Sequence, residues 1–89
     1  MYRILILGKL DRIAEELYKC LNRSYRVQFC TDTNETMQNM MRIVKPDMVM
    51  INAAEQGDIG ENVFEFLHNF YLHLPVVVVG KKENCDCYN

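Results

Sequence analysis

Four short runs of mainly aliphatic residues alternate with segments in which apolar residues recur at helical spacing. Tyr2–Leu7 contains four consecutive aliphatic residues, and Asp47–Asn52 and Val76–Val79 are similar runs. Continuous apolar runs of this length are typical of strands buried on both faces of a parallel sheet. Tyr25–Cys30 alternates apolar and polar residues, as expected of an edge strand with one covered face. The pattern therefore predicts four strands.

Three helices are expected between these strands, because each intervening segment carries an apolar stripe. Proline disfavours helix at the preceding residue, so Pro46 and Pro75 should end the second and third helices. The third helix is expected over Asn62–Leu72, after a loop at Ala53–Gly60. The stripes are formed by Leu10, Ile13, Ala14, Leu17 and Leu21, by Met37, Met40, Met41 and Val44, and by Val63, Phe64, Phe66, Leu67, Phe70 and Tyr71.

Strands that alternate with helices imply an α/β domain with a parallel sheet and helices on its faces. Ligands of such sheets bind beyond the carboxyl ends of the strands. The segments to examine for a site are therefore Gly8–Asp11, Cys30–Thr33, Asn52–Asp58 and Gly80–Lys82. The central residues Ile6, Leu7, Val49, Ile51, Val77 and Val78 are expected to be core.

Composition narrows the function classes. The 89 residues are enough for one domain, and 49% of them are hydrophobic, as in a globular chain. A net charge of −2 offers no basic field for nucleic acid. No apolar run approaches the ~20 residues of a membrane span, and the N-terminus lacks the cleavage site of a signal peptide. We therefore expect a cytoplasmic protein with no membrane contact and no direct binding of nucleic acid.

The cysteines predict no disulfide framework. Cys20 and Cys30 lie in apolar-periodic segments, where a free cysteine behaves as a small hydrophobe. Cys85 and Cys87 lie in the polar tail Lys81–Asn89 and would need two more ligands to hold zinc, so exposed thiols are the favoured interpretation and their role stays open. The acids Asp11, Glu55, Asp58 and Glu61 have no diagnostic metal spacing either. We expect no metal and no cofactor.

Residues 45–67, KPDMVMINAAEQGDIGENVFEFL, resemble the centre of the receiver domain of two-component response regulators. In that family a PDLVLLD-type strand ends in the phosphate-accepting aspartate, and a glycine follows eight residues later. Here Asn52 holds the acceptor position and Gly60 the glycine position. YRILILG and LPVVVVG are similar to the family's first and fourth strands. The resemblance implies a flavodoxin-like three-layer sandwich with sheet order 2-1-3-4 and a partial domain over residues 1–80, without the fifth strand and last helices. Residues 81–89 are then a polar tail or the start of a missing continuation.

The residues that the family uses for chemistry are absent from the matching positions. Gly8 and Lys9 stand where the family has its Mg²⁺-binding acidic pair, and Asn52 replaces the acceptor aspartate. Gly80 replaces the hydroxyl residue that reports phosphorylation. An amide is not a useful phosphoryl nucleophile at neutral pH. The resemblance is therefore to a degenerate, or pseudo-, receiver that takes no phosphoryl group from a phosphorelay.

The sequence favours a non-catalytic regulatory and interaction domain of a bacterial signal-transduction protein. We expect it to dimerise or to bind a protein partner through an uncovered sheet face or an edge strand, with an output domain in the same full-length protein. The alternative is a small-ligand, anion or nucleotide-binding domain that uses the carboxyl ends of the strands, where Lys9 would bind the anion. A bound phosphate or nucleotide at Lys9 would favour this alternative.

Overall fold

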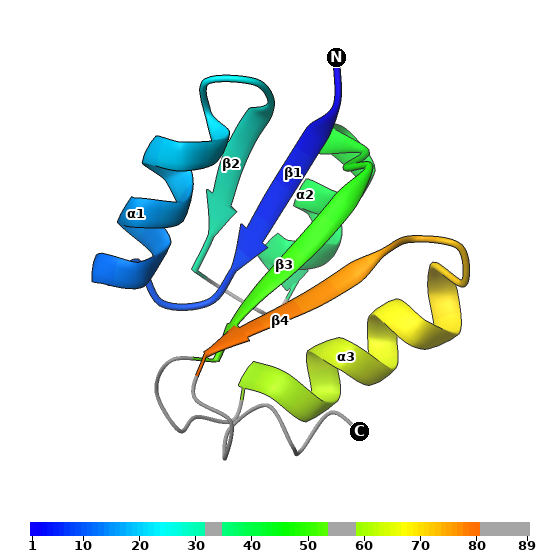
Figure 1. The fold of residues 1–89 in the computed structure, drawn as a ribbon. Coiled ribbons are helices and arrows are strands. Elements are labelled where there is room, and N and C mark those ends of the chain that lie inside the picture. The colour runs from blue at the N-terminus through cyan, green and yellow to red at the C-terminus, as the bar shows by residue number, and fades with distance from the viewer. Residues whose placement is uncertain (32–34, 54–58, 81–89) are drawn as a thin grey trace.

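Strands and helices alternate along the described chain, which comprises residues 1–31, 35–53 and 59–80 of a computed structural model (Figure 1). The apolar runs form the strands, and the segments with helical spacing form the helices. The strands are β1 (Arg3–Leu7), β2 (Arg26–Cys30), β3 (Met48–Ala53) and β4 (Val76–Gly80). The helices are α1 (Arg12–Leu21), α2 (Glu35–Val44) and α3 (Ile59–Phe70).

The strands of the described residues form one parallel sheet in the order β2-β1-β3-β4. This order confirms the predicted α/β fold class and is consistent with a flavodoxin-like arrangement. The central strands β1 and β3 are buried along Ile4–Leu7 and Val49–Ile51. β2 and β4 are the edges, which agrees with the alternating pattern of β2, and no described strand pairs with the outer side of the aliphatic β4.

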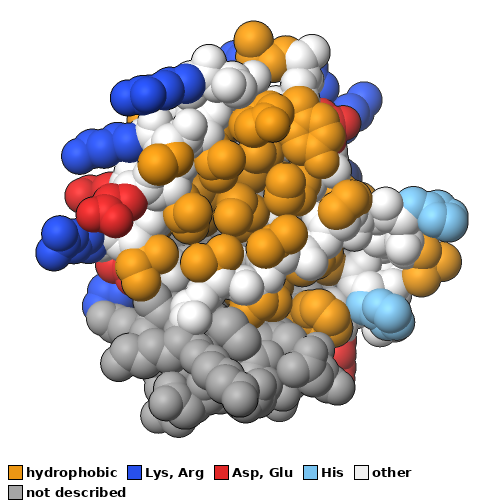
Figure 2. Space-filling model, viewed as in Figure 1, with side chains coloured by type: hydrophobic (Ala, Val, Ile, Leu, Met, Phe, Trp, Pro, Cys, Tyr) orange, Lys and Arg blue, Asp and Glu red, His pale blue; other side chains and the backbone are white. Residues whose placement is uncertain are grey.

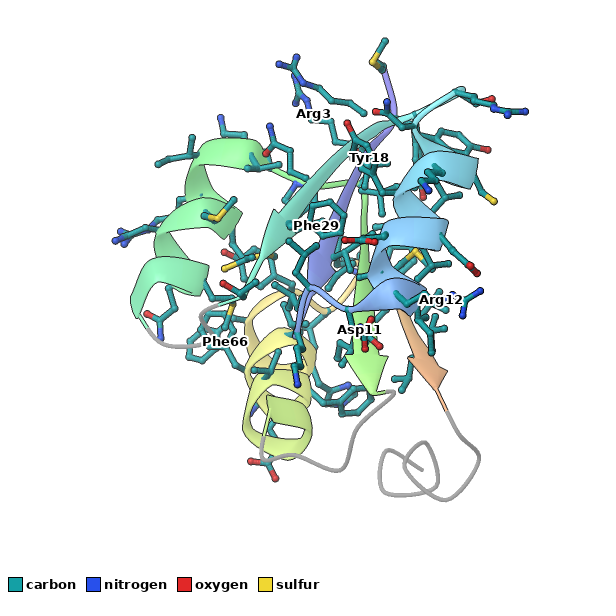
Figure 3. The ribbon with its side chains drawn as sticks, turned by 90° about the vertical axis from the view of Figure 1, so that its left-hand side faces the viewer. Arg3, Asp11, Arg12, Tyr18, Phe29 and Phe66 are labelled. Atoms are coloured by element: carbon teal, nitrogen blue, oxygen red, sulfur yellow. The ribbon has the colours of Figure 1, made fainter. Side chains whose placement is uncertain are left out.

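The two faces of the sheet are covered unequally. The chain steps one way from β1 to β2 and the other way from β2 to β3 and β4, so right-handed crossovers place α1 on one face and α2 and α3 on the other. Figure 3 shows α1 and α2 on opposite sides of the sheet. The core under α2 and α3 consists of Leu5, Leu7, Cys30, Met37, Met41, Val49, Ile51, Val63 and Leu67. The core on the face of α1 consists of Ile4, Ile6, Val27 and Met50, with Leu17 and Leu21 packed against it.

On the face of α1, none of the described helices covers β3 and β4. Figure 2 shows hydrophobic side chains gathered over this part of the sheet. The prediction that Val77 is core is wrong, because its side chain points to the open face of an edge strand and is 40% exposed. Val78 points to the other face, where it is partly buried against the larger core.

α3 differs from the prediction at both ends, since it spans Ile59–Phe70 and not Asn62–Leu72. Its first turn escapes the apolar pattern because the first N–H groups of a helix need no helical partner and the turn tolerates polar residues and glycine. The Tyr71 N–H donates to the Leu67 carbonyl at 2.8 Å and closes the last turn. Ala53, expected in the preceding loop, belongs to β3.

The two cysteines in the described residues lie in different environments. Cys30 is buried in the larger core, as predicted for a small hydrophobe, whereas Cys20 is exposed on α1 and is not part of either core. Cys85 and Cys87 lie outside the described residues. None of the helices in the described ranges is both long and apolar enough to cross a membrane.

Candidate functional site

The carboxyl ends of the strands bring the four positions of the receiver resemblance to one edge of the sheet. Leu7 pairs with Ile51 and Ala53 pairs with Gly80, so Gly8, Lys9 and Asn52 follow within a residue or two at the same edge. Parallel pairing accounts for this convergence, because all strand ends then point the same way. The structure therefore assembles the edge that the sequence singled out.

Gly8 lies so close to β3 that a larger residue does not fit. Its φ angle is +123°, and a Cβ atom on Gly8 would lie 2.9 Å from the backbone oxygen of Asn52. Glycine adopts this backbone conformation without strain, and a residue with a side chain does not. A carboxylate cannot be placed at this position without moving the backbone of β1 or β3.

Asn52 is buried, with 7% of its surface exposed, and its amide joins β3 to the segment before α1. Nδ2 donates to the Lys9 carbonyl at 3.0 Å and to Asp11 Oδ1 at 2.9 Å. Both acceptors require an N–H donor at position 52. The asparagine at the acceptor position thus has a structural use that an aspartate could not fulfil while ionised.

Asp11 caps α1 and is the second polar group of this edge. Its Oδ1 accepts the Ala14 backbone N–H at 3.0 Å, which satisfies one of the donors at the start of the helix. The Ala14 hydrogen bond is the main cause that lowers the pKa of Asp11, and the Asn52 amide lowers it further, against a desolvation effect in the opposite direction. Asp11 therefore stays ionised where an ordinary aspartate begins to protonate.

The described part of this edge serves to hold α1 on the sheet. Its amide, carbonyl and carboxylate are bonded to one another, and no buried side-chain nitrogen or oxygen among the described residues lacks a hydrogen-bond partner. Within the same residues, no three His, Cys, Asp or Glu side chains are grouped so that they could hold a metal ion. Glu55, Asp58 and the side chain of Glu61 lie outside the described part. Anion binding by Lys9, whose side chain is exposed, stays a prediction.

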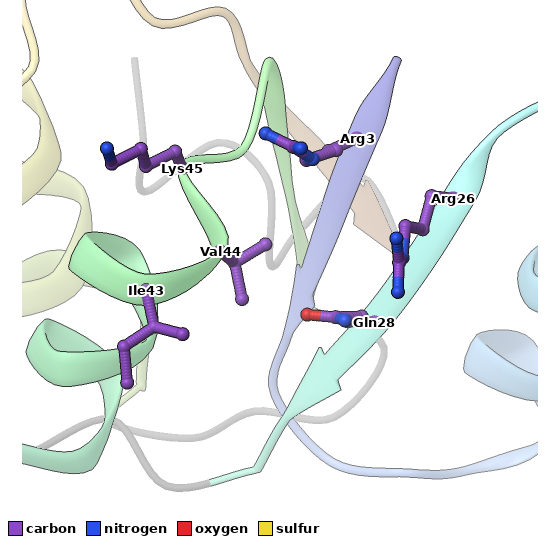
Figure 4. Close-up of a pocket in the computed structure, with 6 residues that line it drawn as sticks. All are labelled: Arg3, Arg26, Gln28, Ile43, Val44 and Lys45. Carbon is purple, nitrogen blue, oxygen red and sulfur yellow. The ribbon is translucent and has the colours of Figure 1, made fainter. Parts of the chain in front are cut away.

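A pocket at the opposite, amino-terminal edge of the sheet was not anticipated from the sequence. It is lined by Arg3, Arg26, Gln28, Ile43, Val44 and Lys45 (Figure 4). The sequence pattern could have indicated this pocket, because a basic residue starts or shortly precedes each of the first three strands. Parallel pairing aligns the starts of strands as it aligns their ends, so these charges come together.

Comparisons of the chain with family models, with curated proteins and with solved structures find no match. The resemblance to a receiver domain therefore rests on the sequence motifs, and the fold rests on the structure described above.

Proposed function

We propose that this domain is a non-catalytic interaction module of a bacterial signal-transduction protein, and that it associates with a second copy of itself. The observation that carries the proposal is the apolar face of β3 and β4 that no described helix covers (Figure 2). Large exposed apolar patches mark interaction sites in folded proteins. The signalling context and an output domain in the same protein are taken from the receiver resemblance.

The uncovered face consists of the exposed surface of β3 and β4, here called the floor, and the adjoining side of α1, here called the wall. Met48, Val77 and Val79 belong to the α1 side of β3 and β4 and form the partly exposed floor, next to the buried Met50. α1 forms the wall: Ala14 is fully buried against the sheet, and Tyr18, on the side towards β2, has its ring 5.4 Å from that of Phe29. Residues on the other side of the helix therefore lie towards β3.

Ile13 precedes Ala14 by one position, about 100° around the helix, which places it on the side away from Tyr18. Its side chain is 40% exposed, and Leu10, just before α1, is 52% exposed. These side chains extend the apolar surface of β3 and β4 onto α1. The charged Arg12 and Glu16, which form a 3.3 Å ion pair, lie on the outer side of α1.

A second copy of the domain would cover this apolar surface with the same surface of its own. A twofold axis along the strand direction packs the β3–β4 floors face to face and brings the β4 edge of each copy against the α1 wall of the other. Sheets stack at a spacing of about 10 Å, close to the thickness of the α1 layer. The edge residues Val76–Val79 carry no charge, and uncharged edges readily meet another chain.

The test compares Val77→Glu with Ile43→Glu by sedimentation equilibrium from low micromolar concentration upward. Both residues are exposed, at 40% and 80%, so both variants should fold, which circular dichroism verifies. Val77 lies in the proposed interface, and Ile43 lies on α2 across the sheet. We expect the wild type and Ile43→Glu to dimerise, and Val77→Glu to dissociate at least about tenfold more readily, since burying an unpaired charge is costly.

A wild type that stays monomeric throughout, or two glutamate variants that dissociate equally, would refute self-association through this face.

A further inference from the structure

The amino-terminal edge of the sheet concentrates positive charge in a way that the fold does not require. Arg3 at the start of β1 and Arg26 at the start of β2 are register partners in the parallel ladder. Like charges on directly paired residues destabilise a sheet. Within the described part of the chain, neither guanidinium forms an ion pair with an acidic side chain. The repulsion between Arg3 and Arg26 therefore destabilises the sheet, and no ion pair among the described residues offsets it.

Both arginines direct their side chains to the same side of the sheet. Leu5 and Leu7 face α2 and α3, and Arg3 shares their alternation along β1. Cys30 faces the same side, and Arg26 and Gln28 share its alternation along β2. Figure 4 shows the Arg3 and Gln28 side chains directed towards α2, with the Arg26 side chain beside them along β2.

The end of α2 adds a third basic residue to the pocket lining, Lys45, whose side chain extends away from Arg3 in Figure 4. Lys45 follows the last helical residue with a φ angle of 51°, and its N–H donates to the Met41 carbonyl at 3.1 Å. A non-glycine residue in the left-handed region is strained, and glycine or asparagine is the usual choice at this position. A cation is also favoured at a helix C-terminus, which explains a lysine here but not the two arginines beside it.

These side chains line a hollow of about 460 Å³. The volume lies within the ~300–1,000 Å³ typical of small-molecule sites. Gln28 adds an amide, and Ile43 and Val44 add an apolar wall. None of the lining residues is acidic. The nearest acid in the sequence, Asp47, uses its Oδ2 to accept the Arg3 backbone N–H at 2.7 Å.

We infer that this hollow, the basic pocket of Arg3, Arg26 and Lys45, binds a small phosphorylated molecule. Guanidinium groups bind phosphate oxygens with two parallel hydrogen bonds. The two arginines match a phosphate dianion, Lys45 adds positive charge at the rim, and the apolar wall accommodates a ring or short aliphatic portion of the ligand. The pocket lies at the opposite end of the strands from Asn52 and is independent of the proposed self-association.

The experiment titrates the ¹⁵N-labelled protein with phenyl phosphate and with pyrophosphate and follows the amide signals. We expect saturable shifts at Arg3, Arg26, Gln28, Val44 and Lys45. The double variant Arg3→Gln/Arg26→Gln should weaken binding by roughly tenfold or more, because hydrogen bonds to charged groups are among the stronger ones. Its thermal midpoint should be unchanged or higher, since the repulsion between paired arginines is removed.

The matched control is Arg12→Gln/Arg23→Gln, which removes the same net charge from α1 and the segment after it. It should leave the affinity for phenyl phosphate within about twofold of wild type, because exposed charges at a distance are screened by salt. Equal weakening by the two double variants would show a diffuse charge effect and overturn the proposal. Shifts centred on Lys9 and Gly80, or no saturable shifts, would also overturn it.

Discussion

Replacement of Asn52 by aspartate tests whether this position is structural. The change restores the acceptor residue of the receiver family with almost no change in volume. In the wild type, the Asn52 amide donates to the Lys9 carbonyl at 3.0 Å and to the Asp11 carboxylate at 2.9 Å. An ionised aspartate has no proton to donate, so both contacts become oxygen against oxygen.

The expected loss of stability is large for a domain of this size. The lost hydrogen bonds contribute about 1 kcal/mol to a neutral acceptor and about 1.5–3 kcal/mol to a charged one. Two carboxylates at about 3 Å repel by about 1.4 kcal/mol in water and about 5.5 kcal/mol at an effective dielectric constant of ~20. Asn52→Asp should therefore lower the free energy of unfolding by about 4 kcal/mol or more near neutral pH. The total free energy of unfolding of a small domain can be as little as ~5 kcal/mol.

The loss should depend on pH in a direction that identifies its cause. Burial and the Asp11 carboxylate both raise the pKa of an aspartate at position 52 above its ordinary value. The destabilisation is therefore complete above this raised pKa and shrinks as the pH falls through it, since the protonated acid again offers a donor. The free energy of unfolding of the wild type should change little over the same pH range, because the pKa of Asp11 is lowered.

Urea unfolding followed by far-ultraviolet circular dichroism measures these differences, with Asn52→Ala as the control. Alanine loses the same two hydrogen bonds without adding a charge, so its deficit should stay constant between about pH 8 and pH 5, well above the ordinary carboxyl pKa of ~3.9. A variant Asn52→Asp that is as stable as the wild type at neutral pH, or that follows Asn52→Ala at every pH, would refute the assignment of these contacts.

The same variant tests the chemical interpretation. Incubation with acetyl phosphate and Mg²⁺ should leave the mass of both the wild type and Asn52→Asp unchanged, because Gly8 and Lys9 supply no carboxylates for the metal. Gain of one phosphoryl group by the variant would show that the acidic pair is not needed.

Two further predictions concern stability. Val49→Ala, at a fully buried site, should lower the free energy of unfolding by about 2–3 kcal/mol and the thermal midpoint by roughly 10 °C or more. Val77→Ala, at a site 40% exposed, should cost under about 1 kcal/mol. Equal shifts of the two thermal midpoints in calorimetry would contradict the packing of β3 and β4. Asp11→Ala should cost about 2 kcal/mol or more through the lost cap and the lost acceptor of Asn52. Because the pKa of Asp11 is lowered, the wild-type advantage is present above the ordinary value of 3.8 and disappears as the pH falls through the lowered one, and unfolding curves at acidic pH that keep a constant gap would contradict it.

The local pattern of apolar and polar residues was sufficient to predict the strands and helices and their order along the chain. The aliphatic runs at Ile4–Leu7 and Val76–Val79 indicated strands, and Pro46 indicated where the second helix ends. The alternation of strands and helices then dictated parallel pairing, and the receiver resemblance supplied the order 2-1-3-4 that the structure confirms. The ends of α3 were less predictable, because the first turn of a helix has no obligatory apolar position.

The contacts of the candidate site were decided by tertiary structure. Asn52 and Asp11 are far apart in sequence, and the parallel pairing of β3 with β1 brings the amide of one within 2.9 Å of the carboxylate of the other. The sequence indicated that Asn52 cannot accept a phosphoryl group, but not that its amide holds the start of α1. Likewise, the exposure of Val77 follows from the absence of a described helix over β4 and not from its neighbours in the chain.

The same distinction applies to the charges. The sequence by itself determined that Arg3, Arg26 and Lys45 lie near the starts of strands, because each stands at or shortly before an aliphatic or alternating run. It could not determine that they converge, since strand direction and register are set by pairing between segments more than twenty residues apart. Parallel pairing in register placed the two arginines side by side, and the left-handed turn after α2 placed Lys45 in the lining of the same pocket.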